Sequence, residues 1–169
     1  DGKAITIAEA VQRRVSALSA ESGYSSMVLP LRSVGVQGDS RTYAHPALVC
    51  GTMDWPLVEE LSTSITNSVR EVNRVVYGLR VEENPQYRLI EAYVTRPRLD
   101  TLRAFDHIVT EALHRFGEYA AVWQMPVVLL PIVNKQGAQC GVLRPIMSQE
   151  AMTARFARLK EETLKYILE

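Results

Sequence analysis

The chain has 169 residues, 47% of them hydrophobic, and 19 Lys and Arg residues balance 19 Asp and Glu residues to a formal net charge of zero. This length and apolar content suffice for one ordinary domain or two small lobes with a hydrophobic core. The balanced charge disfavours a nucleic-acid partner, because no basic field attracts phosphates. No run approaches the roughly 20 apolar residues of a membrane span, and the start lacks a signal-peptide pattern. We therefore expect a cytoplasmic protein with reduced cysteines.

The first half of the sequence alternates between helical and extended apolar patterns. Asp54 precedes a helical stripe and is a suitable N-cap, while Gly38 and Asp39 separate two extended segments as hairpin turns do. The predicted elements are a helix over residues 7–18, a hairpin with strands 27–36 and 43–51, a helix over 54–69 and a strand over 73–81.

Polar residues around Asn84 and Pro85 mark the best boundary, which divides the chain into a first lobe, 1–83, and a second lobe, 84–169. The second lobe again mixes both patterns. Its first predicted elements are an extended piece over 87–94 and a helix that begins at Asp100 and is ended by Gly117. Strands over 125–133 and 139–147 follow, and then a helix capped by Ser148 that runs to residue 167.

The order strand, strand, helix thus occurs twice, and residues 28–31 of the first lobe correspond in pattern to 129–132 of the second. We predict an α+β fold of two related strand-strand-helix-strand lobes, with small, mostly antiparallel sheets and helices packed on one face. The second lobe is expected to lack its last strand.

The three histidines give no metal-site pattern. His107 and His114 are seven residues apart on one helix face, whereas helical metal ligands are normally three or four apart. A solvated face is the favoured interpretation. His45 precedes a proline in a strand-like segment, and the sequence assigns it no role.

The turn that contains Gly38, Asp39, Ser40 and Arg41 is the most distinctive polar feature. A guanidinium leaves a tight turn beside a hydroxyl and a carboxylate, which suits either a bound anion or an internal Asp39–Arg41 pair. From the residues alone the internal pair is favoured. The chain has neither a nucleophile elbow nor a phosphate-binding loop that ends in Gly-Lys-Ser/Thr.

Gln124 is a polar residue at the start of a very apolar predicted strand. A buried amide there needs hydrogen-bond partners. Backbone capping is the simpler interpretation, and contact with a ligand is the alternative.

Residues 29–43, Leu-Pro-Leu-Arg-Ser-Val-Gly-Val-Gln-Gly-Asp-Ser-Arg-Thr-Tyr, are very similar to the run that opens the dimerisation domain of GMP synthetases. Residues 72–77 resemble the Asn-Arg-Val-Val-Tyr strand of that family, and residues 123–126, Trp-Gln-Met-Pro, and Met152-Thr153 resemble its second half. The chain thus resembles the C-terminal dimerisation domain of this glutamine-hydrolysing ligase, in its longer, two-lobe form.

The resemblance implies a homodimer that converts XMP to GMP with ATP and glutamine. The glutaminase and ATP pyrophosphatase domains carry the chemistry in that family, and this chain has the motifs of neither. By resemblance, Arg41 reaches the XMP phosphate of the partner subunit, supported by Gly38, Asp39 and Ser40, and Gln124 contacts XMP in its own subunit. No catalytic residue, metal or cofactor is expected in this chain, and ATP and Mg belong to the parent enzyme. The family's C-terminal Lys-Pro-Pro segment, which closes over XMP, is not in this sequence.

Two other functions are compatible with the pattern of elements. The duplicated order permits a freestanding small-ligand-binding module of two ferredoxin-like lobes. RNA binding through an exposed sheet is the weakest alternative, because the aromatic platform of such modules is missing and the net charge is zero.

Overall fold

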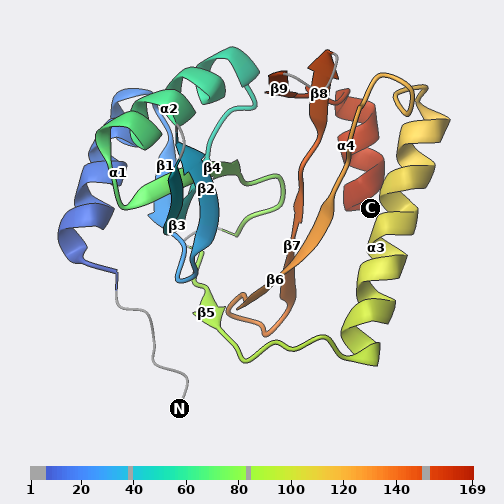
Figure 1. Cartoon of the computed structure of the whole chain (residues 1–169), viewed down its shortest axis with the longest axis horizontal. Helices are drawn as coiled ribbons and strands as arrows, with labels where there is room; N and C mark the ends of the chain where they lie inside the picture. Colours follow the sequence, from blue (N-terminus) through green and yellow to red (C-terminus); the bar gives the residue numbers. More distant parts are fainter. Residues whose placement is uncertain (1–6, 38–39, 83–84, 150–152) are drawn as a thin grey trace. The chain divides into compact units, whose positions relative to one another are not determined.

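The computed structural model describes residues 7–37, 40–82, 85–149 and 153–169 (Figure 1). The chain divides into two units. Unit 1 consists of Asp1–Ile90 and Ile132–Ala138, and unit 2 of Glu91–Pro131 and Gln139–Glu169. The predicted lobe boundary between residues 83 and 84 falls outside the described residues and stays a prediction, as does the relatedness of the lobes.

Unit 1 is a four-stranded sheet with two helices. Its main elements are α1 (Glu9–Glu21), β1 (Ser25–Val28), β2 (Ser33–Gln37), β3 (Ser40–Cys50), α2 (Trp55–Ser68) and β4 (Val72–Tyr77). The long strand β3 pairs antiparallel with β1 and with β2, and parallel with β4. The side chain of Asp54 accepts a hydrogen bond from the Leu57 N–H at 3.2 Å, which confirms the predicted cap of α2.

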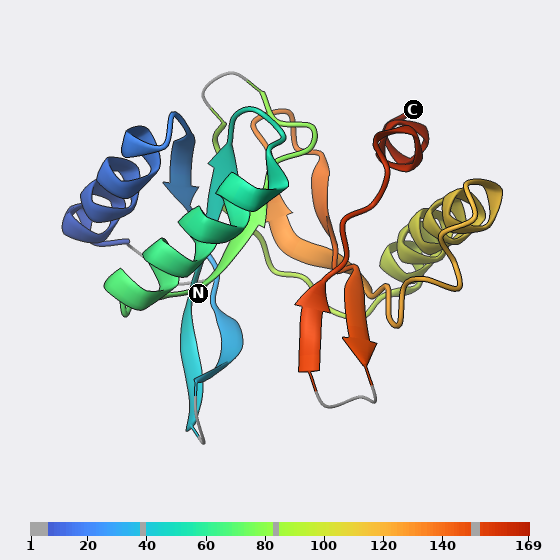
Figure 2. The same cartoon turned by 90° about the horizontal axis from the view of Figure 1, so that it is seen from above.

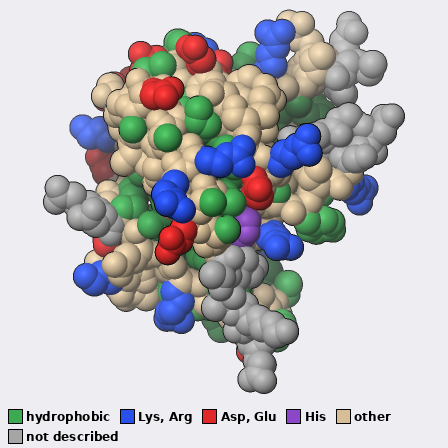
Figure 3. Space-filling model, turned by 90° about the vertical axis from the view of Figure 1, so that its left-hand side faces the viewer, with side chains coloured by type: hydrophobic (Ala, Val, Ile, Leu, Met, Phe, Trp, Pro, Cys, Tyr) green, Lys and Arg blue, Asp and Glu red, His purple; other side chains and the backbone are tan. Residues whose placement is uncertain are grey.

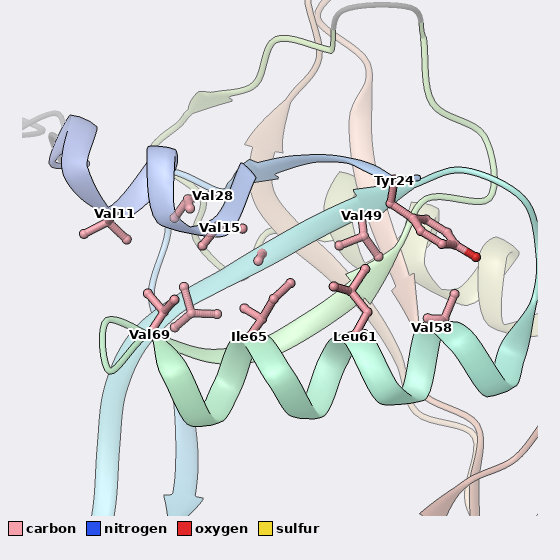
Figure 4. Close-up of a cluster of buried hydrophobic side chains, with 11 residues drawn as sticks. Val11, Val15, Tyr24, Val28, Val49, Val58, Leu61, Ile65 and Val69 are labelled. Atoms are coloured by element: carbon pink, nitrogen blue, oxygen red, sulfur yellow. The ribbon is translucent and has the colours of Figure 1, made fainter. Parts of the chain in front are cut away.

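An apolar cluster attaches both helices to the sheet (Figure 4). Side chains of α2 point towards those of α1 and of the strands, and the cluster contains eleven buried residues: Val11, Val15, Tyr24, Val28, Ala47, Val49, Val58, Leu61, Ile65, Val69 and Val72. Burying one such aliphatic side chain contributes roughly 1.5–3 kcal/mol. Leu61, Ile65 and Val69 of the predicted stripe are therefore confirmed as core residues, whereas Leu57 is only partly buried and Val58 is buried in its place.

Proline divides the first predicted strand. Residues 27–36 were expected to be continuous, but β1 ends at Val28 and β2 begins at Ser33. Pro30 has no N–H for a ladder, and the Leu31 N–H donates to the Leu29 carbonyl at 2.8 Å in a tight turn. The two short strands consequently pair with different ends of β3.

Unit 2 contains α3 (Arg96–Arg115), most of β6 (Val127–Val133), β7 (Gln139–Leu143), β8 (Ile146–Gln149), β9 (Thr153–Phe156) and α4 (Glu161–Leu168). The strand β5 (Arg88–Leu89) of unit 1 pairs antiparallel with Ile132 and Val133 at the end of β6. Helix α3 begins four residues before the predicted Asp100, with Pro97 in its first turn, and Gly117 follows it at φ 70°.

The predicted helix from Ser148 is wrong. Ile146–Gln149 and Thr153–Phe156 form an antiparallel hairpin, and α4 begins only at Glu161. The apolar spacing that suggested a helix is overridden by this strand pairing. Pro145 separates β7 from β8, so the predicted strand over 139–147 is also two strands.

Most of the sheet pairing is antiparallel and helices pack on sheets, so the α+β class is confirmed. Residues 28–31 and 129–132, however, differ in structure: the first set runs from the end of β1 into a turn, and the second lies within β6. None of the helices in the described part of the chain is long and apolar enough to cross a membrane.

Candidate functional site

The hairpin of unit 1 carries Arg41. We call residues 33–37 and 40–44 the arm; they pair from Ser33↔Ala44 to Gln37↔Ser40, so the predicted hairpin is confirmed up to its tip. In Figure 2 the arm projects away from α1 and α2. The pairing of β3 with β1 begins only at Ala47, which leaves the arm beyond the rest of the sheet.

The two faces of the arm differ in chemistry because successive strand residues point to opposite sides. Val34, Arg41 and Tyr43 belong to one face, on which Val34 and Tyr43 are directly opposite each other. All three are exposed, with Tyr43 70% and Val34 41% accessible. A permanent charge beside exposed apolar surface is thus presented to solvent.

The opposite face is held by Asn73 of β4. Its Nδ2 donates to the Ser33 carbonyl at 2.7 Å and to the Thr42 carbonyl at 3.4 Å, and its Oδ1 accepts from the Ser33 hydroxyl at 2.8 Å. The amide therefore joins both strands of the arm to β4. The sequence predicted a strand here, and the resemblance marked residues 72–77, but neither assigned a role to Asn73.

Gly35 leaves the space that Asn73 fills. A Cβ atom at Gly35 would lie 2.9 Å from both the Cβ and the Nδ2 atoms of Asn73 and 2.9 Å from the Thr42 Oγ1 atom. Such distances are shorter than real contacts permit. A glycine is needed at this position so that the Asn73 amide can lie against the arm.

Two further contacts anchor the base of the arm. The Arg74 guanidinium donates to the Val34 carbonyl at 2.8 Å. His45 is buried, its backbone N–H donates to the Glu71 carbonyl at 2.9 Å, and its Nδ1 lies 3.0 Å from the Leu29 carbonyl. His45 therefore has a structural environment that the sequence did not reveal.

The residues predicted to support Arg41 are only partly described. Gly38 and Asp39 fall outside the described residues, and Ser40 is described only as the first residue of β3. The predicted internal Asp39–Arg41 pair stays a prediction. The ion pairs among the residues that the structure describes do not involve Arg41.

Gln124 lies in unit 2, just before β6, and is exposed. The expectation of a buried amide is therefore wrong, because β6 begins three residues later. The Gln124 backbone forms a bridge to Ile146, with the Ile146 N–H donating to its carbonyl at 2.8 Å. These backbone bonds hold the residue and leave its side chain accessible.

Both α3 histidines are exposed, in agreement with the predicted solvated face. His114 stacks on Tyr119 with ring centroids 4.0 Å apart. Within residues 7–37, 40–82, 85–149 and 153–169, no group of three or more His, Cys, Asp or Glu residues is placed to hold a metal ion.

Basic and acidic side chains are interspersed over the face shown in Figure 3.

Residues 14–85 match the family model described as the GMP synthase C terminal domain. This segment includes the arm, Asn73 and Arg74, so both motif runs that meet in unit 1 lie inside the match. The remaining residues, among them Gln124, lie outside it.

Curated relatives cover most of the chain. It is 38% identical over 156 residues to a probable glutamine-hydrolyzing GMP synthase of Leptospira interrogans, covering 90% of this chain and 26% of that protein. It is 33% identical to a probable GMP synthase of Caenorhabditis elegans, with 83% of this chain and 22% of the relative covered, and 38% identical to the GMP synthase of Thermobifida fusca, with 68% and 25% covered.

The chain thus spans about a quarter of the length of the relatives that it matches. The family match to unit 1 and the relatives that extend through unit 2 agree with each other. The chain therefore belongs to the GMP synthase family, in which it is a C-terminal domain.

Proposed function

We propose that this chain pairs the subunits of a GMP synthase and completes its XMP site. The full enzyme converts XMP to GMP with ATP and glutamine in purine biosynthesis. Ammonia is released by a glutaminase domain, and an ATP pyrophosphatase domain activates XMP. The chain alone performs no complete reaction. ATP and Mg belong to the pyrophosphatase domain, and the enzyme works in the cytoplasm.

The observation that carries the proposal is the presentation of Arg41. Its side chain is exposed on a projecting arm whose other face is held by Asn73. A planar, permanently charged guanidinium matches the oxygen atoms of a phosphate and can bind two of them at once. Arg41 therefore suits contact with the XMP phosphate bound by the partner subunit.

The neighbours of Arg41 suit a subunit interface. Val34 and Tyr43 are exposed apolar side chains on the same face of the arm. Tyrosine and arginine are enriched in protein interfaces, where an apolar body and a polar end are both used. A net charge of zero also weakens repulsion between two copies.

Gln124 is the second proposed XMP contact, within its own subunit. Its exposed amide offers both a donor and an acceptor to sugar or phosphate oxygens. The alternative of a freestanding small-ligand module has less support, because the relatives that match the chain are GMP synthases of which the match covers only about a quarter.

Steady-state kinetics of the complete synthase, with ammonia as nitrogen donor, test the proposal. Replacing Arg41 with Ala should raise the KM for XMP roughly 10- to 100-fold, since a hydrogen bond to a charged group contributes about 1.5–3 kcal/mol. Arg70→Ala is the matched control, because Arg70 is an exposed arginine of unit 1 outside the arm. An unchanged KM for Arg41→Ala would refute the role of Arg41.

Light scattering over a wide concentration range tests subunit pairing. The proposal expects a dimer of the complete enzyme. A monomer that retains full GMP synthesis would contradict it.

A further inference from the structure

We infer that Asn73 is a positioning residue for Arg41, fixing the direction in which the arm presents the guanidinium. This inference rests on the proposed function of Arg41. Asn73 lies on the opposite side of the arm from Arg41 and donates hydrogen bonds to the backbone carbonyls of Ser33 and Thr42. It is therefore not itself a ligand of XMP.

The ladder between β3 and β4 does not reach the arm. The pairing of β4 with β3 runs from His45 to Val49, and its register is irregular between His45 and Pro46. The arm begins where this ladder ends. Apart from the strand that continues into it, the arm must be held by side chains.

Asn73 supplies this support with every polar atom of its amide. Its Nδ2 donates to carbonyls of both arm strands, those of Ser33 and Thr42, and its Oδ1 accepts the Ser33 hydroxyl at 2.8 Å. Thr42 directly precedes Tyr43 and follows Arg41. The amide thus fixes the backbone one residue from the guanidinium-bearing position.

The fit is close on all sides. Gly35 is paired with Thr42 and lies so near Asn73 that even a Cβ atom would be 2.9 Å from it. The Arg74 guanidinium holds the Val34 carbonyl at 2.8 Å. Asn73 and Arg74, two successive residues of β4, therefore both form hydrogen bonds to the arm. Of the two, Asn73 is the one that bonds to β3, the strand of Arg41.

Loss of the Asn73 amide leaves the two strands of the arm paired with each other but no longer fixes the angle between the arm and β4. The Arg41 guanidinium would therefore be correctly placed to bind the phosphate for a smaller fraction of the time. The KM for XMP should rise roughly 3- to 10-fold in Asn73→Ala, a change that corresponds to the usual contribution of one hydrogen bond. The kcat value at saturating XMP should change little.

A double-mutant cycle in the complete synthase tests the inference. If Asn73 acts through Arg41, Asn73→Ala should raise the KM in the wild-type background and add nothing once Arg41 is alanine. The matched control is Asn67→Ala, since Asn67 is an exposed asparagine of α2. Asn73→Asp keeps the size of the side chain and an oxygen that can accept from the Ser33 hydroxyl, but it loses the N–H groups that donate to the Ser33 and Thr42 carbonyls. It should therefore behave like Asn73→Ala.

The outcomes separate the two claims. An Arg41→Ala enzyme with unchanged KM would overturn the proposed function. A normal effect of Arg41→Ala, combined with the same KM increase from Asn73→Ala in both backgrounds, would overturn only the positioning role. If Asn73→Ala does not fold, Ser33→Ala, which removes only the bond to Oδ1, replaces it in the same cycle.

Discussion

Units 1 and 2 both bury apolar helix residues but differ in the polar contacts that accompany this packing. In unit 1, α1 and α2 are held by the apolar cluster, which contains no charged side chain. In unit 2, α4 is held to the end of α3 by polar groups: the buried Glu118 carboxylate accepts the Lys160 N–H at 3.0 Å and the Thr163 hydroxyl. Tyr166 adds a hydrogen bond to Glu111 at 2.9 Å.

The difference shows what each attachment depends on. Apolar burial is distributed over many side chains and is not directional. The carboxylate contact is concentrated in one group, and its loss leaves the buried Thr163 hydroxyl and the partly buried Lys160 N–H without this partner. Unit 1 is thus suited to support a projecting arm, whereas the attachment of α4 combines the buried Leu164 with polar contacts that meet at Glu118.

The largest effect should come from the centre of the unit 1 cluster. Ile65 is fully buried, and Ile65→Ala should lower the free energy of unfolding by about 2–5 kcal/mol through lost burial and a cavity. Urea unfolding followed by circular dichroism measures this. Glu60→Ala, at an exposed position of the same helix, should be nearly neutral. Equal effects of the two variants would contradict the apolar attachment.

A smaller and more local effect is expected from Glu118→Ala. The change should weaken the attachment of α4 by about 1–3 kcal/mol, chiefly the cost of leaving the buried Thr163 hydroxyl unsatisfied. Hydrogen exchange should show loss of protection in α4 with protection in α2 retained, and Asp106→Ala on the exposed face of α3 is the control. Uniform loss of protection would show that the units do not differ in this way.

The smallest effect concerns pH in unit 1. Burial raises the pKa of the Cys50 thiol above its usual 9.0, and burial, followed by Tyr24 and Cys50, raises the pKa of Tyr77 above 10.0. Because the pKa of each group is higher in the folded chain, the unfolded chain loses these protons first as the pH rises. The free energy of unfolding is therefore fully maintained below pH 9 and decreases as the pH rises further.

The urea midpoint should accordingly be lower at pH 10 than at pH 7.5, and the difference should shrink in Cys50→Ala. Cys140, whose pKa burial also raises, provides the comparison in unit 2. A midpoint that increases with pH in this range would contradict the sign.

Sequence patterns predicted the elements that local chemistry determines. The α2 stripe from Leu61 onward, the Asp54 cap and the Gly117 helix end depend on residues within a few positions of each other, and all three are present. The failures involve prolines and distant pairing. Pro30 and Pro145 end strands that looked continuous, and the β8–β9 hairpin replaces a helix whose apolar spacing was persuasive.

The candidate site was only partly predictable for the same reason. The exposure of Arg41 follows from its turn and from strand alternation. The hydrogen bond between Ser33 and Asn73 joins residues 40 positions apart in the sequence. It depends on the parallel pairing of β3 with β4, which no local pattern encodes. The resemblance marked both segments but could not show that they touch.

The most direct test of the proposed role is complementation between two complete synthase variants, Arg41→Ala and Gln124→Ala, mixed and allowed to exchange subunits. If Arg41 serves the partner's site and Gln124 its own, each mixed dimer has one intact site, and activity with near wild-type KM for XMP should return to about a quarter of the wild-type level. If no activity returns although mixed dimers form, Arg41 does not act across the subunit interface, and the account is contradicted.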